Sequence, residues 1–275
     1  MAPLEKRRRD SGLLLAPWRE QKAGKTLSLL PLNTSATFGT RRSLTTTLEE
    51  ALPVVLAYGW AVDDASMPYG ADNPYLWAYH SYDTVLRNTS NPMEAAVFAA
   101  NGLNAGISAT TMLRILAKID AGELPDLRSL PPFWTLNPRL LNNDPRDNSP
   151  EGILWSWYRT MKAISDVGGA VSAKVGFHLA PHAMPLWDSV VGKYWSPNNM
   201  WGELANNIVG EAEWLDALEY LVEYFRVNFR DGDGVPLNRS RLVDILTWSE
   251  GVGQFDNLLA RGRRILNSVT DPATW

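Results

Sequence analysis

The residues best suited to binding or catalysis lie between positions 164 and 191, where two glycines precede a helical run and an aspartate follows it. Gly168 and Gly169 suit a tight turn, and the start of the next helix presents unpartnered backbone N–H groups that bind phosphate well. Asp188 carries a carboxylate, which stabilises positive charge developing on a sugar or activates a water molecule. The pattern therefore predicts a phosphate-binding turn, followed by an aspartate that could either cap a helix or take part in catalysis.

This segment resembles the helix-hairpin-helix region of the base-excision DNA glycosylases. The sequence ISDVG at 164–168 stands where that superfamily has a Leu-Pro-Gly-Val-Gly hairpin, and LWDSV at 186–190 stands where it has an aspartate loop of the Val-Asp-Thr-His-Val type. The interval between the hairpin glycine and the aspartate is also that of the superfamily. The resemblance implies that Asp188 is catalytic and that no cofactor is needed. The residues that it implies in DNA binding are Val167, Gly168, Gly169, Ala170 and Lys174.

Two positions depart from the family pattern. Asp166 replaces the first hairpin glycine; aspartate tolerates a left-handed backbone, but its charge disfavours a phosphate unless a cation intervenes. Ala170 stands where bifunctional members carry a lysine nucleophile, and Lys174 lies one helical turn further on. The resemblance therefore implies a monofunctional hydrolase that uses water and leaves an abasic site. The chain has no cysteine, which excludes the iron–sulfur cluster of some relatives.

Asp188 has a second interpretation as a helix N-cap. An aspartate before Ser-Val-Val accepts hydrogen bonds from the first backbone N–H groups of a helix and stabilises it by roughly 1 kcal/mol. The two roles are compatible, because a capped carboxylate is held rigidly, as a preorganised charge should be. The hairpin upstream favours the catalytic role.

Aromatic residues near the predicted site could line a pocket for an extruded base. Trp187 and His178 flank the aspartate loop, and the irregular stretch 63–83 adds further candidates. These are Tyr79, His80, Tyr82 and Asp83. The alternative is that such residues only fill a groove between helices. The histidines of the chain are too dispersed to predict a metal site.

The charge of the chain is unevenly distributed. Residues 1–42 carry nine Lys and Arg against three acids, a balance of +6 within a net charge of −4, so residues 43–275 stand at −10. A basic arm on an acidic body adds affinity for the DNA backbone at low salt, while a solvated tail is the alternative for its first residues. We expect a basic arm at 1–42 and a helical domain at 43–275, with the hairpin and aspartate loop at 164–191.

Hydrophobic spacing predicts a mostly α fold. Apolar residues recur with helical period, and cap signals such as Asn91 before a proline, or Thr46 with Glu49, precede several segments. Helices are expected from about residue 46 and over 91–103, 107–119, 211–229, 242–246 and 255–266. Residues 122–152, rich in Pro and Asn, are expected to form an irregular connection. The resemblance implies a helix-hairpin-helix DNA glycosylase-like bundle with irregular aromatic-rich loops.

These features, together with the resemblance, predict a monofunctional DNA glycosylase that flips a modified base out of double-stranded DNA and hydrolyses its glycosidic bond. The aromatic loops favour a hypermodified base, such as glucosylated hydroxymethylcytosine of phage DNA attacked in antiviral defence, over a damaged or mismatched base met in repair. A non-catalytic DNA-binding protein and a helical interaction protein are the alternatives. No apolar run reaches membrane-spanning length, and the lack of cysteine fits a cytoplasmic location.

Overall fold

The computed structural model describes residues 35–36, 44–59, 85–88, 91–103, 105–195, 200–229 and 237–270. Most of these residues are helical, so the mostly α class predicted from the sequence is confirmed. The strands β1 (Ser35–Ala36) and β2 (Leu44–Thr45) form a short antiparallel ladder. The α-helices are α2 (Leu48–Gly59), α4 (Pro92–Gly102), α5 (Ala109–Asp120), α6 (Pro138–Leu141), α7 (Pro150–Lys162), α8 (Gly169–Leu179), α9 (Met200–Gly210), α10 (Ala212–Phe229), α11 (Arg239–Gly251) and α12 (Phe255–Thr270). The 3₁₀ turns are η1 (Leu127–Ser129), η2 (Phe133–Thr135) and η3 (Val191–Lys193).

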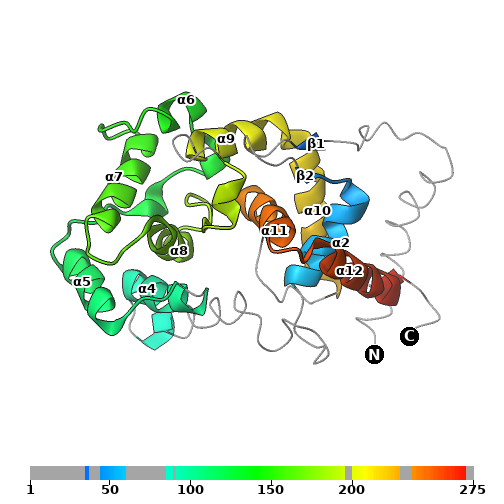
Figure 1. The fold of residues 1–275 in the computed structure, drawn as a ribbon, viewed down its shortest axis with the longest axis horizontal. Coiled ribbons are helices and arrows are strands. Elements are labelled where there is room, and N and C mark those ends of the chain that lie inside the picture. The colour runs from blue at the N-terminus through cyan, green and yellow to red at the C-terminus, as the bar shows by residue number, and fades with distance from the viewer. Residues whose placement is uncertain are drawn as a thin grey trace.

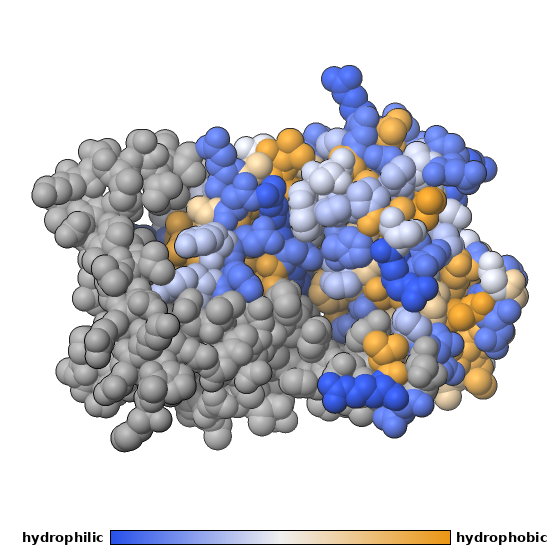
Figure 2. Space-filling view, turned by 180° about the vertical axis from the view of Figure 1, so that it is seen from behind, coloured by the Kyte–Doolittle hydropathy of each residue, from blue (hydrophilic) through white to orange (hydrophobic). Residues whose placement is uncertain are grey.

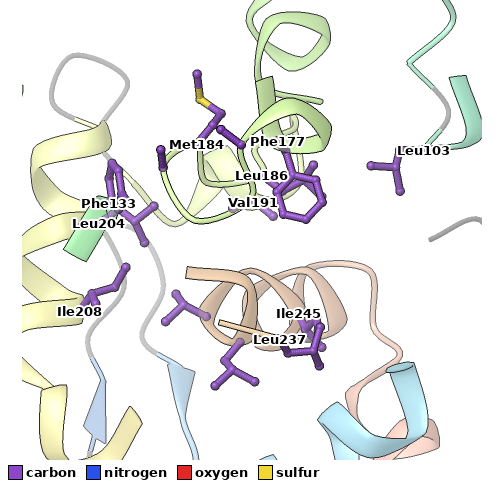
Figure 3. Close-up of a cluster of buried hydrophobic side chains, with 14 of the residues drawn as sticks. Leu103, Phe133, Phe177, Met184, Leu186, Val191, Leu204, Ile208, Leu237 and Ile245 are labelled. Carbon is purple, nitrogen blue, oxygen red and sulfur yellow. The ribbon is translucent and has the colours of Figure 1, made fainter. Parts of the chain in front are cut away.

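The helices form two groups that meet near α8 and α11 (Figure 1). Helices α4, α5 and α7 lie around α8 on one side, and α2, α10 and α12 lie with α11 on the other. One buried hydrophobic cluster runs through both groups and includes Phe177 of α8 and Ile245 of α11 (Figure 3). Helix α8 and η3, which belong to the 164–191 segment with the predicted site, therefore lie next to the junction of the two groups.

Side-chain caps fix the starts of several helices. The Asn91 side chain accepts a hydrogen bond from the Met93 N–H at 3.0 Å ahead of α4. The Ser108 hydroxyl accepts one from the Thr111 N–H at 3.1 Å ahead of α5. These caps satisfy backbone donors that the helix itself cannot pair. They explain why α4 and α5 begin close to the predicted residues 91 and 107.

The start of α2 differs by one residue from the capping box predicted at Thr46 and Glu49. The helix begins at Leu48, and Glu50 Oε2 accepts a hydrogen bond from the Thr47 N–H at 3.2 Å. Thr47 therefore occupies the N-cap position, and Glu50 occupies the N3 position, whose side chain accepts a hydrogen bond from the N-cap N–H in a capping box. The repeated threonines and glutamates offer both registers, and the folded chain adopts the later one.

Two parts of the helical pattern differ from the sequence-based expectation. The connection at 122–152 contains η1, η2 and α6 and is not wholly irregular. The structure also has two helices that were not expected from the sequence, α7 and α9. In α7 the buried residues are spaced as on one face of a helix: Leu154, Trp157 and Met161. This spacing is the signal that could have identified α7.

The described part of the surface carries no extended apolar face in the view from behind. Figure 2 shows a mainly hydrophilic surface there, with hydrophobic side chains in small groups among the polar ones. Large hydrophobic residues that are exposed include Leu113 of α5 and Tyr220 of α10. Within the described ranges, no helix combines the length and the apolar character needed to cross a bilayer.

Candidate functional site

Helix α7 is followed by a short turn at 163–168 and then by α8. Asp166 has a left-handed backbone with a φ of 68°, whereas Gly168 has a φ of −85°. The left-handed position of the turn is thus Asp166 and not the glycine pair, and aspartate adopts this conformation more readily than most residues. Gly168 is the N-cap of α8 and offers no side-chain acceptor, so the first N–H groups of α8 receive no cap from it.

A cation lies beside the aspartate that replaces the hairpin glycine. Arg114 of α5 donates a hydrogen bond from Nη1 to Asp166 Oδ2 at 2.9 Å, in an ion pair that is largely exposed. Next to this pair is a shallow cavity of about 340 Å³, lined by Arg114, Ala117, Lys118, Glu123, Ile164 and Ser165. The positive charge of Arg114 therefore offsets the negative charge that would otherwise repel a phosphate at the turn.

The aspartate loop packs directly against the start of α8 through Trp187. A Cβ added at Gly169 would lie 2.6 Å from Trp187 Cζ3 and 2.6 Å from the Tyr158 hydroxyl. A Cβ added at Gly192 would lie 2.8 Å from Trp187 Nε1. The indole thus occupies a slot between two glycines, and the slot requires that both lack side chains.

Asp188 is held at the edge of this slot as a cap. Its Oδ1 accepts hydrogen bonds from the N–H groups of Val190 at 2.8 Å and Val191 at 2.9 Å. The residues that follow form the 3₁₀ turn η3 instead of the longer helix expected from the sequence. Within the described residues both of these hydrogen bonds go to Oδ1, and no hydrogen bond to Oδ2 is found.

Lys174 points into the molecule. Its Nζ donates a hydrogen bond to the Leu103 carbonyl at 2.6 Å, and the residue is 8% exposed. Burial lowers the pKa of the Lys174 ammonium, and the negative charge of Asp188 opposes part of that shift. Of the other residues predicted to contact DNA, Val167 is buried and Ala170 is half-buried. A phosphate at this turn would therefore have to be contacted by the backbone of α8 and by Arg114.

His178 lies in a buried polar cluster on the side of α8 that faces α11. Arg241 and Asp244 form an ion pair there with exposed fractions of 2% and 4%. Arg241 also donates a hydrogen bond to the Tyr58 hydroxyl at 3.0 Å, and its guanidinium lies 5.7 Å from the centre of the Phe177 ring. Burial, with the charge of Arg241 adding to it, lowers the pKa of His178 to about 3. His178 is therefore neutral near pH 7.

Sequence reasoning missed Arg114, Arg241 and Asp244. Arg241 and Asp244 are spaced as an ordinary pair on one helix face, and nothing local indicates that this face is buried. The remaining predicted pocket residues, Tyr79, His80, Tyr82 and Asp83, lie outside the described residues. So does the predicted basic arm at 1–42, apart from residues 35–36.

The described residues include no cluster of three or more His, Asp or Glu side chains that could hold a metal ion. Comparison with known proteins assigns no family to the chain: no family model, no curated protein and no solved structure is significantly similar to it. The function must therefore be argued from the site itself.

Proposed function

We propose that this protein is a monofunctional DNA glycosylase that excises a modified base from double-stranded DNA. The observation that carries the proposal is the packing of Trp187 against Gly169, because it brings the aspartate loop against the start of α8. A carboxylate and a set of helix N-terminal N–H groups then share one site. A phosphate at the turn would fix the DNA backbone while Asp188 acts on the sugar of a flipped nucleotide.

The proposed chemistry is hydrolysis of the bond between sugar C1′ and the base nitrogen. As this bond breaks, positive charge develops on the sugar, and the negative charge of Asp188 stabilises it. Water supplies the hydroxyl that adds to C1′, and its proton ends on the departing base. With Oδ1 occupied by backbone N–H groups, Oδ2 is the oxygen that would face the sugar or orient the water.

The proposed substrate class is a modified base, with hypermodified phage cytosine as the first candidate and a damaged or mismatched base as the alternative. The sequence predicts that residues of the 63–83 stretch, which lies outside the described residues, line the base pocket. Those residues carry the aromatic side chains that favour a bulky, sugar-bearing base. Both alternatives use the same bond cleavage, so they differ only in the pocket.

One observation favours a second candidate, a non-catalytic DNA-binding protein. The double hydrogen bond to Asp188 Oδ1 is what a purely structural cap requires. In this alternative the hairpin would still bind phosphate, and Asp188 would only hold η3 in place.

The deciding experiment incubates the protein with normal duplex DNA, duplexes carrying damaged or mismatched bases, and phage DNA with glucosylated hydroxymethylcytosine. Abasic sites are then detected by strand cleavage after alkali. We expect abasic sites on one of the modified substrates, formed far more slowly with Asp188→Asn. Binding to every duplex without abasic sites on any of them would support the non-catalytic candidate. Absence of both binding and base release would reject both.

A further inference from the structure

We propose that Trp187 is a positioning residue, which sets the location of the Asp188 carboxylate relative to the DNA-binding start of α8. This inference rests on the proposed glycosylase function. It assigns to Trp187 the task of coupling two parts of the site, in place of the base-stacking role predicted from the sequence. The geometry of the slot, and not any contact with a substrate, carries the argument.

The slot is closed on both sides by backbone. On the α8 side, a Cβ at Gly169 would meet the six-membered ring of Trp187 at 2.6 Å, and on the η3 side a Cβ at Gly192 would meet Nε1 at 2.8 Å. Real Cβ atoms do not approach other atoms this closely, so each glycine lets the backbone lie directly on the indole. The ring therefore sets the separation between α8 and η3.

Asp188 cannot adjust independently of this separation. It follows Trp187 in the chain, and its Oδ1 is hydrogen-bonded to Val190 and Val191. Leu186 and Val191, on either side of it, are buried in the hydrophobic cluster below α8 (Figure 3). A change in the filling of the slot must therefore move the carboxylate together with η3.

The indole acts through its shape and not through a polar contact. Trp187 Nε1 is buried and has no hydrogen-bond partner among the residues that the structure describes. Since no acceptor depends on the indole N–H, a phenylalanine should fill part of the same slot without losing a hydrogen bond. This distinguishes a positioning role from recognition of a base by the indole N–H.

The test measures DNA affinity and single-turnover base release for the wild type and variants, on the substrate that the wild type cleaves. Trp187→Ala should lower the rate roughly 100-fold, the loss expected from a displacement of about 1 Å at a catalytic group, with affinity changed less than about threefold. Trp187→Phe should recover much of the rate. Trp214→Ala, which removes another buried tryptophan, from α10, controls for general destabilisation and should keep a rate near that of the wild type.

A size exchange gives a second, independent readout. Gly192→Ala places a methyl group against the five-membered ring of Trp187 and should lower the rate. Combining it with Trp187→Leu removes the whole indole, which leaves room for the added methyl group, and should restore part of the lost rate. A Trp187→Ala variant that keeps the rate of Trp214→Ala would overturn the positioning role while leaving the glycosylase proposal intact. Equal losses of affinity and rate would also overturn it, because they indicate a merely structural residue. A wild type that releases no base would reject the proposed function and this inference with it.

Discussion

At the scale of single residues, Asp188 combines a structural and a proposed chemical task on its two oxygens. Asn caps a helical turn nearly as well as Asp, so Asp188→Asn removes the charge and keeps the Oδ1 acceptor. We expect base release to fall by roughly 100- to 1,000-fold, the usual loss for one preorganised charge-stabilising group. Thermal unfolding and DNA affinity should remain close to the wild type. A single-turnover rate equal to that of the wild type would show that the carboxylate only caps η3.

The absence of an amine at position 170 leads to a second prediction at this scale. Ala170 cannot form a Schiff base, and the Lys174 amine is buried against the Leu103 carbonyl. Borohydride should therefore trap no covalent protein–DNA adduct during base release, and strand breaks should appear only after alkali or heat. An adduct formed by the wild type and lost in Lys174→Met would show instead that this amine reaches the sugar.

At the scale of elements, the hairpin depends on a charge supplied by another helix. Arg114→Gln should weaken binding to all duplex sequences alike and lower the salt dependence of binding by about one counterion, because the Arg114 charge lies beside the proposed phosphate site. Asp166→Asn should do the opposite and strengthen binding, since asparagine also tolerates a left-handed backbone. The double variant should bind nearly as well as the wild type.

These binding effects should occur with little change in stability. The Arg114–Asp166 ion pair is exposed at both partners, and such pairs contribute only about 0–1 kcal/mol. Titrations of an unmodified duplex at several salt concentrations, with urea unfolding as the control, test this. If Asp166→Asn weakened binding, the turn would not face a phosphate.

At the scale of the whole molecule, the buried polar cluster between α8 and α11 makes the stability of the fold depend on pH. The pKa of His178 is about 3 in the folded chain, below the unfolded value of 6.5. At pH values between these two, the unfolded state binds a proton that the folded state does not. Stability should therefore fall by about 1.4 kcal/mol per pH unit from this group as the pH drops through that range. Urea unfolding between about pH 7 and about pH 5 should show a shallower decline for His178→Gln. Equal declines would mean that the histidine is protonated in the folded state.

The sequence by itself determined features that depend on neighbouring residues along the chain. Asn91 and Ser108 cap helices where their local patterns place them, and the run after Gly169 forms α8 as its apolar spacing predicts. Helix periodicity and caps are short-range properties, so one segment suffices to predict them.

Only the tertiary structure decided how these elements complete a site. It placed the left-handed turn at Asp166, brought Arg114 to it from α5, and turned Lys174 inward to Leu103. It also set Trp187 between two glycines that are far apart in the chain. Such contacts depend on which helix faces meet when the core packs, and the spacing of residues in one segment carries no information about the element that will lie against it.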